Sequence, residues 1–172
     1  ADDGIHGEGV WRSDGTSGGT YLAEKIYPGF ESFRPGWGAT LRGAVYFWHT
    51  DGVHGNKLWR TDGTADGTKI AVDVFPGPYN NSPTTVAVAA GLLYFDATDP
   101  DDGRELFRSD GTPEGTFVFD IVPGHDSSSP WWLTSADGLL FFSAEDLVHG
   151  RELWVIDVER SILRPRGRLW PD

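Results

Sequence analysis

Short runs of apolar residues separated by turns predict β-strands along most of the chain. In residues 77–122, for example, four such runs occupy 85–89, 92–97, 105–109 and 116–122, with glycine, aspartate or proline between them. The runs alternate apolar with polar residues and are rich in β-branched and aromatic side chains, and no stretch shows a helical period with capping residues. The pattern therefore predicts an all-β protein made of four-stranded antiparallel units.

The same pattern recurs along the sequence. The motif DGTxxGT occupies 14–20, 62–68 and 110–116, so successive copies begin 48 residues apart. A run ending in Trp or Phe precedes each copy, at 9–11, 57–59 and 105–107, and it appears once more at 152–154. Four antiparallel strands that recur every ~40–50 residues are typical of a β-propeller blade. An elongated β-solenoid is the competing architecture.

The repeat also predicts how the chain is organised. We expect one repeat domain over 1–172, with units at 8–55, 56–103 and 104–150, partial units at 1–7 and 151–157, and a divergent C-terminal cap at 158–172. That is about three and a half blades, fewer than an ordinary closed propeller contains. We therefore expect a protein partner, either a second copy or a further part of a longer chain, to complete the ring.

Several motifs resemble those of the ELWxxDGT repeat family, bacterial multi-repeat proteins that are mostly secreted or surface-associated. The matching residues are 58–63 (LWRTDG), 105–111 (ELFRSDG), Glu152–Trp154 with Asp157, and the PGxxSSSP segment at 123–130. The resemblance extends from 1 to about 157. It implies a propeller-like fold and an extracellular, periplasmic or cell-surface location, and it implies no established chemistry.

Composition and charge narrow the possible functions. The chain has 14 basic and 26 acidic residues and a formal net charge of −12, which argues against nucleic acid and against docking on anionic lipid. It has no cysteine, so disulfides, thiolate metal sites and a thiol nucleophile are excluded. No apolar run reaches the ~18–20 residues of a membrane span. Familiar catalytic motifs such as GxSxG and HExxH are also missing, which favours a non-catalytic role.

Residues present in every copy are expected to serve the scaffold. The repeated aspartates should bind turn backbone, and the aromatic residues of the third strand should pack between blades: Asp14, Asp62, Asp110 and Asp157, and Trp11, Trp59, Phe107 and Trp154. His6, His54 and His149 share one loop position. A shared zinc is a weaker interpretation of these histidines than a hydrogen-bonding loop role, because equivalent positions on successive blades lie far apart.

One acidic loop is the candidate metal site. Asp96, Asp99, Asp101 and Asp102 place four carboxylates within seven residues. Calcium takes six to eight oxygen ligands in flexible geometry, although the spacing does not match an EF-hand loop. The sequence therefore allows a calcium site here, with a solvated acidic loop as the alternative, and it requires no other cofactor.

The segments between blades differ most among the copies and are the candidate ligand-binding region. They contain aromatic rings beside amide, carboxylate and imidazole groups, a combination that suits carbohydrate, because a sugar stacks on a ring while its hydroxyls meet polar side chains. The candidate residues are Trp37, Tyr79, Asn80, Asn81, His125, Asp126, Trp131 and Trp132. Packing at the ends of the core is the alternative role for the tryptophans.

The sequence thus predicts a binding or adhesion module that contacts a glycan or a protein partner through loops on one propeller face. A structural subunit of a larger assembly is the alternative. An enzyme such as a propeller glycosidase, which would use two carboxylates ~5–9 Å apart, is the weakest hypothesis.

Overall fold

The protein is described by a computed structural model that covers residues 9–26, 38–78, 83–160 and 162–166, with the backbone alone for Asp99 and 162–166. Its strands in chain order are β1 (Val10–Arg12), β2 (Tyr21–Glu24), β3 (Gly38–Leu41), β4 (Ala44–Thr50), β5 (Asn56–Thr61), β6 (Lys69–Val72), β7 (Val86–Ala89), β8 (Leu92–Asp99), β9 (Gly103–Ser109), β10 (Phe117–Phe119), β11 (Trp131–Ala136), β12 (Leu139–Asp146), β13 (Gly150–Asp157) and β14 (Ile162–Arg166).

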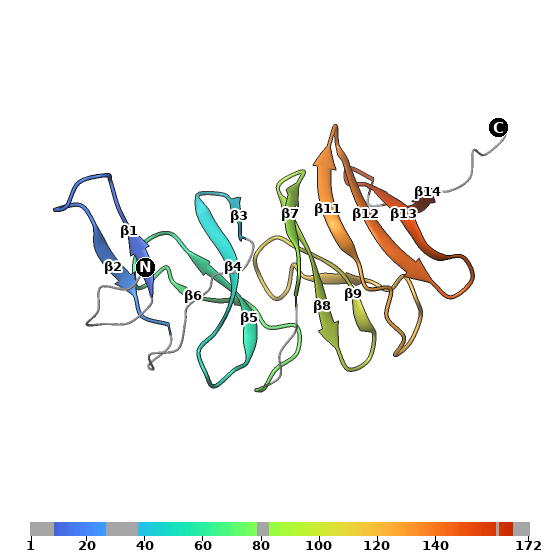
Figure 1. Ribbon diagram of the computed structural model, residues 1–172, viewed down its shortest axis with the longest axis horizontal. Helices are drawn as coiled ribbons and strands as arrows, with labels where there is room; N and C mark the ends of the chain where they lie inside the picture. The colour runs from blue at the N-terminus through green and yellow to red at the C-terminus, as the bar shows by residue number, and fades with distance from the viewer. Residues whose placement is uncertain (1–8, 27–37, 79–82, 161, 167–172) are drawn as a thin grey trace. The chain divides into compact units, whose positions relative to one another are not determined.

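The strands form four antiparallel sheets (Figure 1). Within the described residues, the first sheet is β1–β2, and each of the others has four strands in sequence order: β3–β6, β7–β10 and β11–β14. The predicted all-β class and the four-stranded unit are confirmed. No closed ring of sheets is shown, so the propeller itself stays a prediction. β14 pairs with β13 along 153–157, which makes the divergent C-terminal segment the fourth strand of its sheet.

The chain divides into two compact units, Ala1–Asn81 (unit 1) and Ser82–Asp172 (unit 2). Unit 1 contains the sheets β1–β2 and β3–β6, and unit 2 contains β7–β10 and β11–β14. Each unit is therefore a pair of successive sheets, and each pair has its own hydrophobic cluster.

The DGTxxGT turns fold identically in three copies. In each, the aspartate Oδ1 accepts hydrogen bonds from the backbone N–H and the hydroxyl of the threonine two residues later, at 2.6–3.0 Å: Asp14–Thr16, Asp62–Thr64 and Asp110–Thr112. That threonine hydroxyl then accepts the N–H of the second glycine at 3.0 Å, namely Gly19, Gly67 and Gly115. The expected side-chain-to-backbone role of these aspartates is confirmed.

The second glycine of each turn is required by space. A Cβ atom built on Gly19, Gly67 or Gly115 would overlap the carboxylate of the motif's own aspartate. These bonds also explain why the pKa of Asp14 and of Asp62 lies below its ordinary value: the threonine hydroxyl and N–H stabilise the carboxylate form. Asp157 caps a different turn by accepting the N–H of Arg160 at 3.1 Å.

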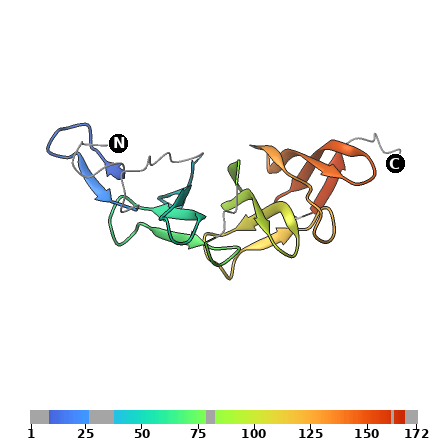
Figure 2. The ribbon, with the colours of Figure 1, turned by 60° about the horizontal axis from the view of Figure 1, so that its bottom comes forward.

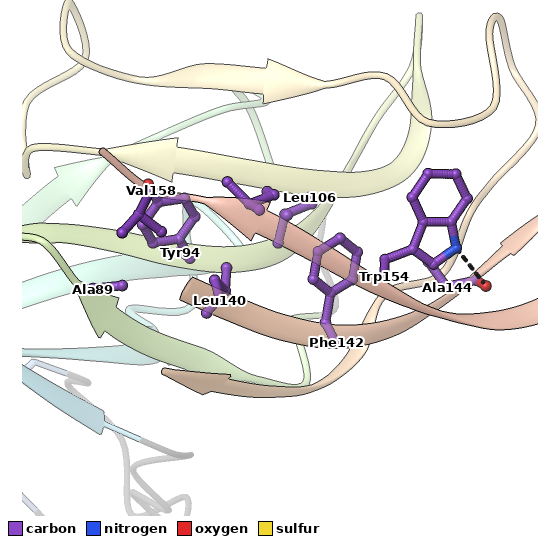
Figure 3. Close-up of a cluster of buried hydrophobic side chains, with 9 residues drawn as sticks. Ala89, Tyr94, Leu106, Leu140, Phe142, Ala144, Trp154 and Val158 are labelled. Atoms are coloured by element: carbon purple, nitrogen blue, oxygen red, sulfur yellow. Dashed lines mark hydrogen bonds between the residues drawn. The ribbon is translucent and has the colours of Figure 1, made fainter. Parts of the chain in front are cut away.

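The core of unit 2 lies between its two sheets (Figure 3). Tyr94 and Leu106 project from β8 and β9 toward β12 and β13, where Leu140, Phe142 and Ile156 meet them. All five side chains are essentially excluded from solvent. Because side chains alternate along a strand, one face of sheet β7–β10 is thus covered by one face of sheet β11–β14.

Unit 1 repeats this arrangement. Val10 and Ile26 of the first part of the unit pack with Phe47, Trp59 and Ile70 of sheet β3–β6. The positions correspond across the repeat, since Val10 aligns with Leu106 and Trp59 with Trp154. In both units, then, the later sheet covers the same face of the earlier one.

Two of the four third-strand aromatic residues, Trp59 and Trp154, pack between sheets as predicted. Trp59 and Trp154 belong to the two clusters, and each indole Nε1 donates to a carbonyl of the neighbouring strand, His49 at 3.0 Å and Ala144 at 3.2 Å. Phe107 at the equivalent position has no N–H to donate and instead stacks on Phe95, with ring centroids 5.8 Å apart.

Candidate functional site

The segment that joins the two sheets of unit 2, residues 123–130 (the crossover), is the framework of the candidate site. Its central serine, Ser128, is fully buried and is bound by Glu105 of β9. Glu105 Oε1 accepts the Ser128 N–H at 2.7 Å, while Oε2 accepts the Ser128 hydroxyl at 2.5 Å and the N–H of Ile121 at 3.1 Å. The Ser128 carbonyl in turn accepts the N–H of Glu145 of β12 at 2.7 Å. We call this chain of contacts the Glu105 latch.

The serines on either side of Ser128 fix the crossover further. Ser127 Oγ accepts the backbone N–H of Arg104 at 2.9 Å, and Ser129 donates its N–H to the Arg104 carbonyl at 3.1 Å. Arg151 of β13 donates from Nη1 to the Ser129 carbonyl at 3.1 Å. All three serines of the SSSP motif therefore bind the sheets that they connect, and the loop is held from both sides.

Burial of Glu105 raises the pKa of its carboxyl group above the ordinary value of 4.5, although the donors from Ser128 and Ile121 oppose the shift. A raised carboxyl pKa is one mark of a catalytic acid. Glu105 is nevertheless fully buried, and both oxygens already accept hydrogen bonds from the protein. Its geometry is that of a structural latch, and a substrate has no access to it.

The crossover lies against the acidic loop that connects β8 and β9. Figure 2 brings this end of unit 2 forward. His125 Nδ1 donates to the carbonyl of Pro100 at 2.7 Å. Gly103 comes so close to the crossover that a Cβ on it would lie 2.5 Å from the Asp126 carbonyl oxygen, and its φ of 70° favours glycine as well. Within unit 2, the acidic loop and the crossover thus lie on one surface.

Two adjacent tryptophans follow the crossover at the start of β11. Trp131 is 44% exposed and Trp132 is 76% exposed, and their ring centroids lie 6.5 Å apart at an interplanar angle of 49°. The β11–β12 register shifts between Trp131 and Thr134, and Trp132 has a left-handed φ of 61°. The expectation that these tryptophans cover the ends of the core does not describe Trp132, whose indole is mostly in solvent.

The predicted ligand residues are only partly described. His125, Asp126, Trp131 and Trp132 lie on one short stretch of unit 2, and all four are exposed. Trp37, Tyr79, Asn80 and Asn81 lie outside the described residues. The candidate site is therefore formed by the unit 2 residues alone.

Of the predicted calcium ligands, Asp96 is already bound to protein groups. The Asp96 side chain is buried and faces the β7 side of its sheet, where its carboxylate accepts the N–H groups of Thr84 and Thr85 at 2.8 Å and pairs with the guanidinium of Arg104. Asp101 and Asp102 lie in the loop, and the side chain of Asp99 is not described. Among the described residues, no group of three His, Cys, Asp or Glu side chains that could hold a metal is found. The calcium site stays a prediction.

The loop histidines bind carboxylates of their own loops. His54 Nδ1 donates to Asp51 Oδ2 at 2.5 Å, and His149 Nδ1 donates to Asp146 Oδ2 at 3.0 Å. The N–H and ring of His149 lower the pKa of Asp146, and similar bonds from His54 lower that of Asp51 although its burial acts to raise it. The hydrogen-bonding loop role is confirmed for these two, and His6 lies outside the described residues.

Sequence reasoning missed the Glu105 latch. Glu105 contacts residues up to 23 positions away, and nothing local in the ELF run distinguishes a buried glutamate from an exposed one. A usable signal was present: the SSSP segment follows the ELF unit, and Lys57 and Glu152 show that a charged residue recurs at the same position.

Comparisons with known proteins do not assign a family. No protein-family model matches the chain, and no curated protein matches it. The resemblance to the ELWxxDGT repeat family therefore stays a prediction. In the part of the chain that the structure describes, there is no helix with the length and apolarity to span a bilayer.

Proposed function

We propose that this chain is a non-catalytic carbohydrate-binding module of a secreted or cell-surface protein built from propeller blades, and that Trp132 is its principal ligand contact. The observation that carries the proposal is the exposure and backbone conformation of Trp132. The residue is 76% exposed, and its backbone is left-handed with a φ of 61°. A left-handed conformation costs a non-glycine residue about 1–2 kcal/mol. Strain of this kind persists where the surroundings impose it, and it clusters at ligand sites.

The surroundings supply that constraint. The Glu105 latch and the Arg151–Ser129 bond fix the crossover immediately before Trp131. A ring presented on a fixed loop loses little conformational freedom on binding, which favours affinity. His125 and Asp126 lie exposed on the same crossover and offer polar groups to sugar hydroxyls.

Five acidic side chains of the described region already bind protein groups, which supports binding over catalysis at these positions. Asp14, Asp62 and Asp110 bind their own turns, Asp96 pairs with Arg104, and Glu105 holds the crossover. A glycosidase needs two carboxyl groups that reach the sugar from opposite sides. These five carboxylates are committed to protein contacts.

A glycan array with the purified full chain tests the proposal. Retention of a defined set of glycans is expected, and Trp132→Ala should abolish it while the circular dichroism spectrum stays unchanged. The matched control is Leu147→Ala, which removes a 74% exposed side chain from the neighbouring β12–β13 loop and should leave retention intact. If no glycan is retained, or if Trp132→Ala binds as well as the parent chain, the proposal is wrong. Glycoside hydrolysis by the chain would instead support the enzyme hypothesis.

A further inference from the structure

Trp131 and Trp132 lie side by side at the start of β11, although they are consecutive residues of one strand. Consecutive side chains of a regular strand point to opposite faces of the sheet. The ring centroids of this pair are nevertheless only 6.5 Å apart. The left-handed φ of Trp132 and the register shift between Trp131 and Thr134 interrupt the alternation at this point. The unusual backbone therefore has a specific result, which is to bring two indole rings together.

The chain around the pair holds its backbone in place. Pro130 is buried immediately before Trp131, and its ring fixes its own φ. One residue earlier, Ser129 has a left-handed φ of 46°, and its carbonyl accepts a hydrogen bond from Arg151 Nη1 at 3.1 Å. Trp131 itself pairs with Ser143 of β12. Two rings on a fixed backbone form a surface that needs little ordering when a ligand binds.

The relative orientation of the two rings indicates the shape of the ligand. Trp131 is partly exposed and Trp132 is mostly exposed, and their ring planes meet at 49°. A sugar stacks on one indole at a time, so a tilted pair offers two separate platforms. Coplanar rings suit the flat surface of a crystalline polysaccharide. Tilted rings suit a single chain in which one sugar is rotated relative to the next.

The charges beside the rings favour an uncharged ligand. Arg151, which binds the crossover through the Ser129 carbonyl, already pairs with Glu145 at 3.0 Å. The guanidinium of Arg104, whose backbone binds the crossover, pairs with the buried Asp96. Asp126 of the crossover is exposed. A sulfated or uronic acid sugar would therefore meet an exposed carboxylate, while the arginines bound to the crossover are already neutralised.

We infer that the ligand of the Trp131–Trp132 pair is a single uncharged polysaccharide chain, with neighbouring sugars stacked on the two rings. The inference rests on the proposed carbohydrate-binding function and adds the class of glycan to it. Trp132 holds one sugar, and Trp131 is the contact for the next sugar along the chain. Affinity should therefore depend on chain length, because only two or more linked sugars reach both rings.

Isothermal titration calorimetry on the full chain tests this length dependence. The probes are linear oligosaccharides of glucose, mannose, xylose and N-acetylglucosamine, from one to six sugars long. In a series that binds, affinity should rise about tenfold or more from the monosaccharide to the longer chains, the gain expected of one well-packed aromatic contact. Trp131→Ala should remove most of this gain, and Trp131→Phe should retain much of it because a ring remains.

The matched control is Val148→Ala, which truncates an apolar side chain that is 81% exposed on the β12–β13 loop. It should show the same length dependence as the parent chain, and all variants should keep the parent's circular dichroism spectrum. A pull-down with microcrystalline cellulose or chitin should retain less protein than the soluble chains bind. Sulfated and uronic acid oligosaccharides should bind more weakly than uncharged ones of equal length.

Several results would overturn the inference and leave the proposed function intact. These are equal affinity for the monosaccharide and the longer chains, a length dependence that Trp131→Ala does not change, and a preference for crystalline or acidic polysaccharide. Retention of other glycans on the array without binding to any of the linear series would overturn it as well. In each case Trp132→Ala would still abolish glycan binding. Retention of no glycan at all would instead show that the proposed function is wrong, and the inference with it.

Discussion

Replacing Glu105 with alanine should destabilise unit 2, because its carboxylate holds the buried centre of the crossover. The substitution removes the acceptor of three hydrogen bonds from Ser128 and Ile121, at 2.5–3.1 Å. Ser128 is fully buried, so water cannot replace the carboxylate without a rearrangement of the crossover. The substitution should therefore lower stability in two ways: it leaves buried donors without an acceptor, and it removes a restraint on the crossover.

The magnitude follows from those donors. A buried donor left without a partner costs about 1–3 kcal/mol, so the two backbone N–H groups account for about 2–6 kcal/mol, and the Ser128 hydroxyl can rotate to reduce its own loss. Burial penalises the Glu105 carboxylate, as its raised pKa shows, and removing that penalty offsets part of the loss. We expect a net loss of about 2–4 kcal/mol in the free energy of unfolding. For a chain of this size, that lowers the melting temperature by about 4–16 °C.

Urea unfolding followed by tryptophan fluorescence, with a parallel thermal melt, measures this loss. The matched control is Glu152→Ala, the same residue at the same repeat position on β13, where the carboxylate holds no crossover among the described residues. Its effect should stay within about 0.5 kcal/mol. Limited proteolysis should also cut Glu105→Ala within 123–130 faster than the control. Equal stabilities of the two variants would show that the latch contributes nothing and would refute the reasoning.

Two further predictions concern the turns and the pH dependence of the latch. Gly115→Ala forces a Cβ into the Asp110 carboxylate and should cost about 1–3 kcal/mol in urea unfolding. Gly18→Ala, where no neighbouring atom lies within 4 Å, should be near neutral, and equal losses would contradict the steric explanation. Because the pKa of Glu105 is raised in the folded chain, its contribution is fully present below pH 4.5 and decreases as the pH rises through the folded-state pKa. The stability difference between the parent chain and Glu105→Gln should therefore be largest below pH 4.5 and decline above it, and a pH-independent difference would show that the carboxyl does not titrate as described.

The features that could be predicted from the sequence are those fixed by short-range chemistry. The Asp-Gly-Thr turns are held by hydrogen bonds between residues two or three positions apart, so the motif alone determines the conformation of the turn. The strands of the 77–122 unit were expected at 85–89, 92–97, 105–109 and 116–122, and the structure has strands at 86–89, 92–99, 103–109 and 117–119. Alternation and turn residues determine these elements without reference to the rest of the fold.

Long-range contacts could not be predicted in the same way. The Asp96–Arg104 pair turns a candidate metal ligand into a buried partner of an arginine, and spacing alone does not distinguish the two roles. The exposure of Trp132 could not be predicted from the sequence either, because an aromatic residue at the start of a strand is normally buried. Its exposure follows from the register shift at the start of β11 and from its left-handed backbone, and both depend on how the crossover is anchored.

The repeat position of Glu105 shows how one site in the fold can keep its role while its chemistry changes. In unit 1 the position is Lys57, a fully buried side chain whose Nζ pairs with Asp73 at 2.7 Å and donates to the carbonyl of Phe75. Lysine offers only donors and so binds a carboxylate and a carbonyl, whereas Glu105 offers only acceptors and binds N–H and O–H groups. In both sheets the side chain holds the segment that leaves the fourth strand. At Lys57 and Glu105 the charged side chain thus acts through its reach and its hydrogen bonds, and the sign of its charge matches the groups that the leaving segment presents.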